Sequence, residues 1–478
     1  MLCSTAVFAT FVASTIISNN EASAFSHHTF SNKINSRDVI RTFKSRNCSI
    51  LHSLSHKFSE DEDNFNDTAD INRRSALLSA SKSAASLLAL CNVMSTYPLI
   101  GNADEGMSST MQKTPISASW KSVDGLNSLE ENKKIVSFDP SAYKAMMDDA
   151  SRTPLFEKAI KERLNDPKEA PDGPSSQIVL DMGTGPYALF ALMAAKAGAG
   201  KVYAVEANKE AAKLARLIIK KYGYEDVITV LEGFSSEITL PNNEKADLVI
   251  AEIVGSVASE EGAYATILDA HKRLVKEPNK SSSWIPNRIQ TYAAPASYTL
   301  HTLFQPPAFD WSKLNGEPVR FNCRDEGLQL LSSPALLEDM SFSDIEKYKL
   351  SATDVNFIID GKRIQANTQK FNNEFRINGI KNIEADELSQ KAGSTFTGVA
   401  LWPRLVLDTD GKIEVNSRSY PSGGHQKSHW QTVLPIMNDN PVVIKGGDKV
   451  QVNFDSNLGG GNLLIPPSYK LSGYIISS

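Results

Sequence analysis

The sequence predicts an α/β protein in which a doubly wound parallel sheet is followed by a domain of antiparallel strands. Between about residues 177 and 275, short apolar segments alternate with helical ones, as in successive βαβ units. After Ile285-Pro286 the apolar segments become short, alternate in hydropathy and are separated by Gly, Pro and Asn, which is typical of an antiparallel sheet or barrel. A chain of 478 residues is long enough for two or three domains.

Each element of the first domain follows from its periodicity. An apolar stripe predicts a helical region over residues 137–165, and Pro167, Pro171 and Pro174 end it. Buried strands and helices then alternate, with Asn208 as a helix N-cap. We expect strands at 177–182, 201–207, 227–231 and 246–252, and helices at 188–197, 208–222 and 260–275.

The second half has a weaker pattern. Antiparallel strands are expected at residues 290–294, 396–399, 405–407, 442–445 and 449–454. Residues 302–382 give only a weak helix at 341–350 and a weak strand at 356–359, so the sequence leaves that stretch unassigned.

Composition excludes some classes of function. The net charge of −5 and the isoelectric point near 6.0 argue against a basic face for nucleic acid, so we expect no direct nucleic-acid binding. Three of the four cysteines, Cys3, Cys48 and Cys91, lie in the first hundred residues. Removal of that stretch would leave Cys323 alone, without a partner for an intramolecular disulfide.

The first 103 residues are interpreted as targeting segments. An apolar run at residues 5–17 is of signal-peptide length and precedes Ala22-Ser23-Ala24, a small-x-small junction, so residues 1–24 are expected to be a signal peptide. Residues 25–59 are rich in Ser, Asn, Lys and Arg, with Asp38 as the one acid. Together they resemble the bipartite presequences of algae with secondary plastids, which implies delivery to a plastid (chloroplast).

A second signal is predicted within residues 25–103. Arg73-Arg74 precedes a moderately apolar stretch, residues 75–100, that closes on Gly101-Asn102-Ala103. This resembles a twin-arginine peptide for transfer to the thylakoid lumen, cleaved after Ala103. The alternative is an amphipathic helix or a weak membrane anchor. Lys82 and several serines argue against a spanning helix, so no transmembrane span is expected in the mature chain.

The sharpest local feature is the segment Val179-Leu180-Asp181-Met182-Gly183-Thr184-Gly185, at the end of the first strand of the parallel sheet. Ligands of open α/β sheets bind at the carboxyl ends of strands, where glycines let backbone amides approach closely. Glu206 ends the second strand, where a carboxylate can accept hydrogen bonds from both ribose hydroxyls. This combination predicts a nucleotide-type cofactor; the alternative is a tight turn beside a surface glutamate.

The choice between NAD and S-adenosyl-L-methionine depends on the residues after Gly185. Pro186 and Tyr187 replace the third glycine of a dinucleotide fingerprint and would crowd a pyrophosphate at the helix N-terminus. A cofactor without phosphates does not need that surface. S-adenosyl-L-methionine is therefore favoured, and no metal ligands are expected.

Several motifs together resemble the protein arginine methyltransferases. Residues 179–185, 194–199 and 202–206 are similar to that family's cofactor motif, and residues 251–261 to its double-glutamate hairpin, with Glu252 and Glu261 nine residues apart. Residues 254–256, 283–286 and 293–295 look most like the symmetric-dimethylating branch. Ser428-His429-Trp430 resembles the Thr-His-Trp loop of the asymmetric branch, and residues 146–153 resemble the cofactor-capping helix.

The resemblance implies the fold and the cofactor contacts. It implies a seven-stranded methyltransferase (Rossmann-like) domain with N-terminal capping helices over residues 104–285, and a β-barrel domain for substrate and dimerisation over 286–478, forming a homodimer. Arg152 would hold the cofactor's carboxylate, Met146 would pack near the sulfonium and Glu206 would bind the ribose. The remaining cofactor residues would be Asp181, Gly183 and Gly185 in the glycine turn, and Ser235 and Ser236 beside the adenine.

The expected chemistry is methyl transfer to arginine side chains of protein substrates. A guanidinium presents five donors in a rigid fork and stays protonated, so two carboxylates, Glu252 and Glu261, suit it. His429, oriented by Asp149, would then receive the proton that leaves on methylation.

Departures from the family pattern keep alternatives open. Ala251 replaces a serine common in the family, and Ile253-Val254 replaces the Trp-Met pair of the asymmetric branch. Substrate choice and product type therefore stay open. A catalytically degenerate protein that acts as a binding or regulatory partner is the main alternative, and a methyltransferase for another nucleophile is a third hypothesis.

Overall fold

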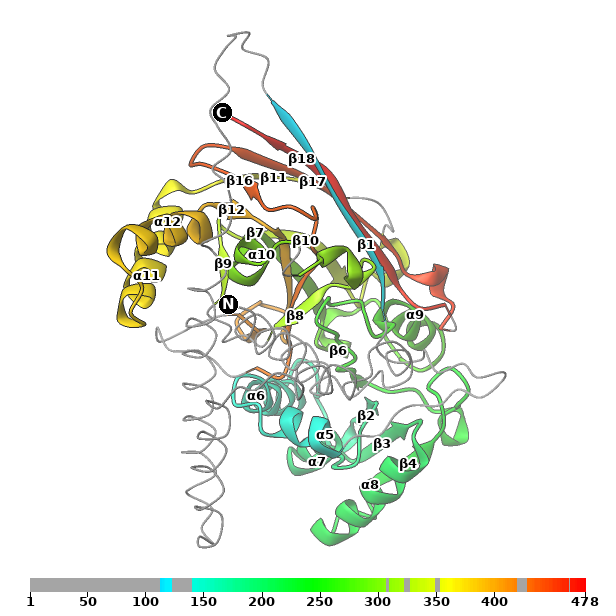
Figure 1. Cartoon of the computed structure of the whole chain (residues 1–478). Coiled ribbons are helices and arrows are strands. Elements are labelled where there is room, and N and C mark those ends of the chain that lie inside the picture. Colours follow the sequence, from blue (N-terminus) through cyan, green and yellow to red (C-terminus); the bar gives the residue numbers. More distant parts are fainter. Residues whose placement is uncertain are drawn as a thin grey trace, which may run out of the picture.

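The structure is a computed structural model that describes residues 112–122, 140–306, 309–321, 327–348, 353–418, 428–463 and 465–478. Residues 1–103, the predicted targeting segments, and Cys323 lie outside the described residues. Figure 1 shows two layers of different construction: α5 to α8 surround β2 to β4 in one half, and long antiparallel strands form the other.

The parallel sheet has five strands in the order β4-β3-β2-β5-β6, all paired in parallel. The prediction of a doubly wound sheet is confirmed, and among the described residues this sheet has five strands where the family resemblance implied seven. The chain leaves the sheet after β6 and enters the antiparallel domain directly at Arg288. The strands are β2 Ile178–Met182, β3 Lys201–Glu206, β4 Ile228–Glu232, β5 Leu248–Ile250 and β6 Trp284–Ile285.

Helices α7 (Leu189–Lys196), α8 (Lys209–Tyr222) and α9 (Ala263–Arg273) follow the predicted pattern. The Asn208 side chain accepts a hydrogen bond from Ala211 N, so the predicted N-cap of α8 is confirmed.

The helical region predicted over residues 137–165 is two helices, α5 (Pro140–Met147) and α6 (Thr153–Leu164). The break lies at residues 148–152. Pro154 stands at the start of α6, where its fixed φ and missing N–H favour a helix beginning. Asp149 and Arg152 lie in this break and are both buried, each 4% exposed.

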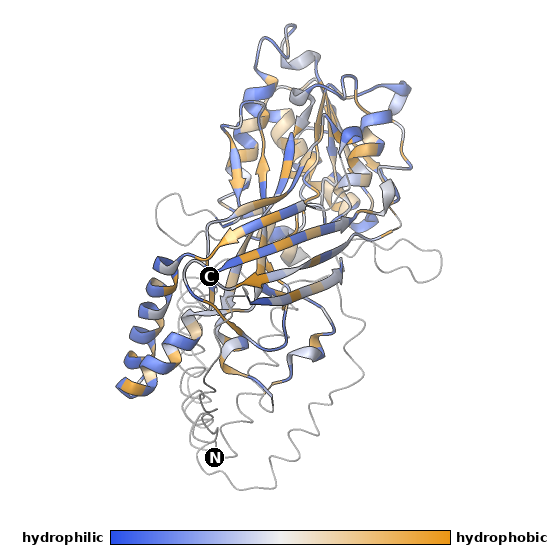
Figure 2. Cartoon of the chain, turned by 90° about the horizontal axis from the view of Figure 1, so that it is seen from above, coloured by the Kyte–Doolittle hydropathy of each residue, from blue (hydrophilic) through white to orange (hydrophobic). Residues whose placement is uncertain are grey.

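The second half consists of two larger antiparallel sheets and the short pair β12–β16. One larger sheet has the order β1-β18-β17-β11, and the other has β10-β7-β13-β15-β8, with β14 on β13 and β9 on β7. Figure 2 shows hydrophilic and hydrophobic residues alternating along the long strands, as expected for strands with one buried face. The main strands are β7 Arg288–Tyr298, β8 Val319–Phe321, β10 Ala335–Ser341, β11 Thr353–Ile358, β13 Gly398–Val406, β15 Thr432–Leu434, β17 Lys449–Asn457 and β18 Ser468–Ile476, with the shorter β9 Leu328–Leu330, β12 Thr395–Phe396, β14 Glu414–Asn416 and β16 Val442–Val443.

The first described strand, β1 (Lys113–Lys121), belongs to this antiparallel half, not to the methyltransferase domain assigned to residues 104–285. It pairs with β18 from Lys113–Ile476 to Lys121–Ser468. Trp120 stacks on Tyr469 with ring centroids 5.3 Å apart. Residues 113–121 thus pair with the antiparallel strands of the second half, where the sequence predicted no strand.

The unassigned stretch 302–382 contains several short elements, among them the 3₁₀ turns Trp311–Leu314 and Ile345–Lys347, and the helix α11 (Gly361–Ile377). The weak strand at 356–359 overlaps β11, whereas the weak helix at 341–350 is only the second of those turns. α11 and α12 (Asn382–Gly393) pack side by side and project from the sheets (Figure 1). Their contact contains a small core of Phe304, Phe371, Phe375, Leu388 and Ala392.

One hydrophobic core runs from the parallel sheet into the antiparallel half. It includes Leu180 and Val249 of the first sheet and Leu401 and Val450 of the others, all 0% exposed. None of the helices among the described residues is long and apolar enough to cross a bilayer.

Candidate cofactor and catalytic site

The glycine turn after β2 has the geometry that its sequence predicts. Gly183 and Gly185 have φ values of +75° and +65°, in the region that favours glycine. A Cβ atom on Gly185 would lie 3.1 Å from the ring of Tyr143 in α5, so this ring covers the turn closely. Gly183 N and Thr184 N donate to Val205 O at the end of β3, which joins the turn to the neighbouring strand.

Asp181 is fully buried beneath the turn. Its Oδ2 accepts hydrogen bonds from Thr184 Oγ1 at 2.5 Å and from Ala191 N at 3.0 Å. Burial raises the pKa of Asp181 to about 7, against the opposing effect of these two donors. Its other oxygen, Oδ1, is buried with no hydrogen-bond partner.

Glu206 ends β3 beside the same turn. Its carboxylate accepts from Gly185 N at 2.9 Å and from Asn208 N at 2.8 Å. Burial raises the pKa of Glu206, and the backbone donors oppose that rise. A carboxylate offers about four lone-pair sites, so these two bonds leave acceptor capacity for the hydroxyls of a ribose.

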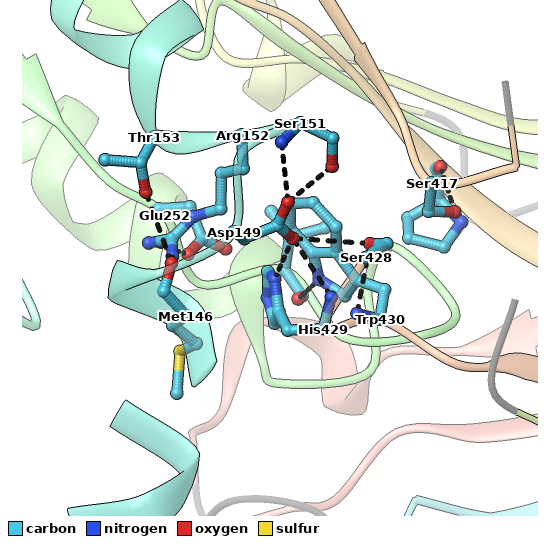
Figure 3. Close-up of polar contacts among 12 residues, drawn as sticks. Met146, Asp149, Ser151, Arg152, Thr153, Glu252, Ser417, Ser428, His429 and Trp430 are labelled. Carbon is cyan, nitrogen blue, oxygen red and sulfur yellow. Dashed lines mark hydrogen bonds and ion pairs between the residues drawn. The ribbon is translucent and has the colours of Figure 1, made fainter. Parts of the chain in front are cut away.

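Asp149 and His429, which are far apart in the sequence, form a buried pair (Figure 3). His429 Nδ1 lies 2.8 Å from Asp149 Oδ2, and His429 N donates to the same oxygen at 3.0 Å. Ser151 N and Ser151 Oγ bind the other carboxylate oxygen. Burial raises the pKa of Asp149, but hydrogen bonds from His429 and Ser151 outweigh it and bring the value to about 2. Asp149 is therefore ionised and holds the imidazole by its Nδ1 edge.

The loop after His429 is attached to the double-glutamate segment, residues 252–261. Trp430 Nε1 donates to Val254 O at 2.7 Å, and Gln431 N donates to Ser256 Oγ at 3.1 Å. The His429 ring lies against Trp430 with centroids 4.0 Å apart and the ring planes tilted by 39°. These contacts bring His429, Asp149 and the segment 252–261 together in one site.

Glu252 is bound to Arg152. Arg152 Nη2 lies 2.7 Å from Glu252 Oε2, and the two side chains are 5% and 6% exposed. Arg152 Nη1 also donates to Met146 O, and the guanidinium lies over the ring of Phe190, 5.0 Å from its centroid. Arg152 Nε is buried without a partner. The family resemblance implied that Arg152 binds the cofactor and that Glu252 binds the substrate. In the structure the two side chains form an ion pair with each other.

The second acid of the segment differs from the expected arrangement. Glu261 is exposed, while its neighbour Glu260 is 0% exposed and is held by both guanidinium nitrogens of Arg320 in β8, with Arg320 Nη1 3.2 Å from Oε2. The fully buried carboxylate of the segment is therefore Glu260. Burial, and then the charges of Glu206 and Glu261, raise the pKa of Tyr143, the residue that covers the glycine turn.

Gly255 permits this packing. A Cβ atom there would lie 2.7 Å from the Glu260 Cβ and 3.1 Å from Val257 O, so a larger residue at 255 would displace the Glu260 side chain. Val257 N donates to Glu260 Oε2 at 3.3 Å, which closes the turn around the buried acid.

The Glu260–Arg320 pair makes a stability prediction. Glu260→Gln should lower the free energy of unfolding by about 3–5 kcal/mol, because it removes a buried charge partner of the Arg320 guanidinium. The measurement is the midpoint of urea unfolding. Glu232→Gln is the control, since it breaks the solvent-exposed pair with Arg216 and should change stability by less than about 1 kcal/mol. Equal changes in the unfolding midpoint for both variants would contradict a stabilising role for the buried Glu260–Arg320 pair.

Met146 contributes a different atom from the one expected, and the expected place of Ser235 and Ser236 beside the adenine stays a prediction. Met146 contributes its backbone oxygen to Arg152 and Thr153. Ser235 and Ser236 lie in the loop after β4, where Ser235 O accepts from Arg273, and no hydrogen bond joins either serine to the glycine turn. Tyr143, Glu260 and Arg320 were missed. The Glu-x8-Glu spacing favours Glu261 and gives no sign that Glu260 is the buried acid.

The site fits S-adenosyl-L-methionine on the evidence of its own unpaired groups. Asp181 Oδ1 and Arg152 Nε are buried polar atoms without partners, and such atoms are rare in folded proteins unless a ligand or water satisfies them. One is an acceptor and the other a cationic donor, which suits the ammonium and carboxylate of an amino-acid ligand. Among the described residues, no group of His, Cys, Asp and Glu could hold a metal ion.

The parallel sheet, its glycine turn and the acid that ends β3 define a Rossmann-like domain of the methyltransferase kind. Residues 132–282 match the family model described as "PRMT5 arginine-N-methyltransferase". The chain is 26% identical to rat (Rattus norvegicus) protein arginine N-methyltransferase 7 over 324 residues, 65% of this chain and 43% of that protein. The chicken (Gallus gallus) protein of the same name is 30% identical over 64% of this chain and 43% of its own length.

Protein arginine N-methyltransferase PRMT10 of Arabidopsis thaliana is 27% identical over 57% of this chain and 70% of its own length. The chain thus spans less than half the length of the methyltransferase 7 proteins it matches. Among solved structures, the Trypanosoma brucei PRMT1 enzyme-prozyme heterotetrameric complex with AdoHcy covers 70% of this chain, with 20% identity and a TM-score of 0.48. The Arabidopsis PRMT10 structure has 18% identity and a TM-score of 0.47.

Proposed function

We propose that this protein transfers a methyl group from S-adenosyl-L-methionine to arginine side chains of protein substrates. The observation that carries the proposal is the joining of three separate segments beside the glycine turn. Residues 429–431 bond to Asp149 and to the double-glutamate segment at Val254 and Ser256, and Glu252 of that segment binds Arg152, three residues after Asp149. The family match over residues 132–282 supports the same reaction.

Two carboxylates would hold the substrate. Glu252 uses Oε2 for Arg152, so its other oxygen keeps lone pairs for a second guanidinium. Glu261 lies at the other end of the same segment, is exposed, and is close enough to Tyr143 for its charge, after burial and Glu206, to raise the pKa of that residue, so it would supply the second carboxylate. Held between them, the target nitrogen would be positioned for attack, and positioning of this kind supplies much of a rate enhancement.

The cofactor would supply an electrophilic methyl group, and the chain's own residues would hold it and move the proton. Glu206 would bind the ribose, the glycine turn would lie against the cofactor, and Arg152 and Asp181 would hold its carboxylate and ammonium groups. His429 would accept the proton released by the guanidinium, because Asp149 fixes its Nδ1 edge and leaves Nε2 to act as the base. The direction of the proton path is therefore set by a buried, ionised aspartate.

The direct test is mass spectrometry of a Gly/Arg-rich peptide incubated with the protein and S-adenosyl-L-methionine. A gain of one or more methyl groups on arginine is expected, and the mass and fragment ions will give the product type. Titration calorimetry with the cofactor is run in parallel. Cofactor binding without arginine methylation would support the degenerate, non-catalytic alternative, and methylation of a different residue would support the third hypothesis.

The cofactor assignment makes its own prediction. Glu206→Ala should weaken S-adenosyl-L-methionine binding by about 1–3 kcal/mol, the cost of losing hydrogen bonds to a charged acceptor. The parallel sheet should remain folded, since Glu206 is the last residue of β3 and its carboxylate bonds only to backbone amides of turns. Titration calorimetry measures the change, and an unaltered affinity would show that the ribose binds elsewhere.

We further propose that the protein is delivered to a plastid, with transfer to the thylakoid lumen as the second step. The apolar run at 5–17, the junction at residues 22–24 and Arg73-Arg74 support it. The mature N-terminus should then lie near Asp104, which leaves β1 intact. N-terminal sequencing of the native protein measures this, and a mature chain that begins at Met1 would contradict both targeting steps.

A homodimer is also proposed. Among the described residues, the exposed apolar side chains include Leu214 and Leu217 on α8, 40% and 58% exposed, and Ile377 and Ile383 where α11 joins α12, 83% and 77% exposed. Two exposed patches on one chain suit a symmetric assembly in which each subunit offers both.

A further inference from the structure

The second half of the double-glutamate segment is bonded to the antiparallel domain at two consecutive residues. Ala258 N donates to Thr291 Oγ1 of β7 at 2.9 Å. Ser259 Oγ lies 2.9 Å from the hydroxyl of Tyr469 in β18, whose ring stacks on Trp120 and Phe454. Residues 258 and 259 come immediately before Glu260 and Glu261, so their placement decides where those two acids lie.

The Thr291 hydroxyl is itself oriented by a third residue. Thr291 Oγ1 donates to Glu338 Oε2 of β10 at 2.7 Å. A hydroxyl has one hydrogen to donate and lone pairs to accept with. Because its hydrogen is directed to Glu338, its lone pair is directed to the Ala258 N–H. By accepting the hydroxyl hydrogen of Thr291, Glu338 leaves the Thr291 oxygen to act as the acceptor for the Ala258 N–H.

Burial of the Glu338 carboxyl group is energetically unfavourable, which indicates a role beyond packing. It is 3% exposed and Thr291 is 0% exposed. Burial raises the pKa of Glu338, and the nearby Ser259, Thr291 and Tyr348 oppose that rise. A buried carboxyl is disfavoured unless its hydrogen bonds offset the loss of water, and an apolar residue would fill the same volume at lower cost.

We infer that Glu338 is a positioning residue for the double-glutamate segment, acting through the hydroxyl of Thr291. The inference rests on the proposed function, since it assigns the antiparallel domain a part in holding the glutamates that would bind the substrate. Glu338 touches neither substrate nor cofactor in this scheme. A displacement of about 1 Å in a group that positions a substrate can lower a rate about 100-fold, so a single hydroxyl can have a measurable effect.

The sharpest test uses matched variants of Thr291. Thr291→Val keeps the shape and removes the hydroxyl, whereas Thr291→Ser keeps the hydroxyl. We expect Thr291→Val to lower kcat for peptide methylation about tenfold or more, with cofactor affinity unchanged, and Thr291→Ser to retain most of kcat. Ser297→Ala is the control, because it removes another buried hydroxyl of β7, bonded to Ala392 O and remote from the segment. It should leave kcat unchanged.

Variants of Glu338 complete the test. Glu338→Leu removes the acceptor and should reproduce the loss of kcat, whereas Glu338→Gln keeps an acceptor for the Thr291 hydroxyl and should restore most of it. Wild-type kcat in Thr291→Val, or equal losses in Thr291→Val and Thr291→Ser, would overturn the inference.

A readout independent of activity separates this inference from the proposed function. Hydrogen exchange, followed by mass spectrometry, should be faster across residues 252–261 in Thr291→Val and Glu338→Leu than in the wild type and Ser297→Ala. If the wild type methylates no arginine, the proposed function fails, and the exchange data alone decide whether Glu338 holds the segment. Unchanged exchange in both variants would show that it does not.

Discussion

Glu252→Gln should lower kcat for arginine methylation by about 10³-fold while S-adenosyl-L-methionine affinity stays within a few-fold. The substitution keeps the volume and removes the charge that would bind a guanidinium, and one preorganised electrostatic group is commonly worth 10²–10³ in rate. Glu261→Gln should have a comparable effect if both acids hold the same substrate group. Steady-state kinetics with a Gly/Arg-rich peptide measures the rate, and calorimetry measures the cofactor.

The two Gln variants should have similarly reduced rates but should differ in their stability to unfolding. Glu252 is buried against Arg152, so its replacement leaves that guanidinium with one charge partner fewer and should also lower the unfolding midpoint. Glu261 is exposed, and its replacement should leave the midpoint unchanged. Full activity in Glu261→Gln would show that Glu261 is not a substrate-binding acid and that the Glu-x8-Glu spacing has no catalytic meaning in this chain.

His429→Ala should lower kcat by about 10²–10⁴, the range of general acid–base groups. Cofactor affinity should change little, because the imidazole bonds to Asp149 and packs against Trp430. Asp149→Asn should lower kcat as well, since the neutral amide no longer favours the protonated imidazole that forms when the base takes a proton. Wild-type kcat in His429→Ala would exclude the proton path.

The pKa of His429 should also determine the pH below which kcat/KM falls. Burial lowers the pKa of His429 below its ordinary value of 6.5, and the hydrogen bond to Asp149 opposes that effect. A base is active when neutral, so kcat/KM should stay constant through neutral pH and fall only below pH 6.5. In Asp149→Asn the opposing effect is lost and the limb should move to lower pH. A limb that lies above pH 6.5 in the wild type would contradict this assignment.

The sequence predicted the elements that repeat a strong pattern. The parallel strands, the glycine turn, Glu206 at the end of β3 and the N-cap at Asn208 all follow from local hydropathy and turn chemistry. The Asp149–His429 contact came from the family resemblance, because no periodicity relates residues that far apart in the chain.

The rest depends on tertiary contacts that leave no local signal. β1 is a polar strand in which only Ile116 and Trp120 are buried, so it looks like a loop until β18 pairs with it. α11 buries only one side against α12, and its many Asn, Gln and Lys residues obscure that stripe. Glu260 and Glu261 are adjacent acids of the same type, and only Arg320, from a strand of the other domain, distinguishes them.

The pairing of β1 with β18 has a consequence for the order of folding. The first and last described strands are neighbours along their whole length, and Ser477 N also bonds to Gln112 O. On a ribosome, β1 emerges before every other described element, yet its partner is synthesised last. The parallel domain can fold before β1 has a strand to pair with. Contacts between distant parts of a chain also form slowly. Because Ser122, just after β1, donates to Glu260 O at 2.9 Å, this contact of the double-glutamate segment is expected to form only after β18 has been synthesised and has paired with β1.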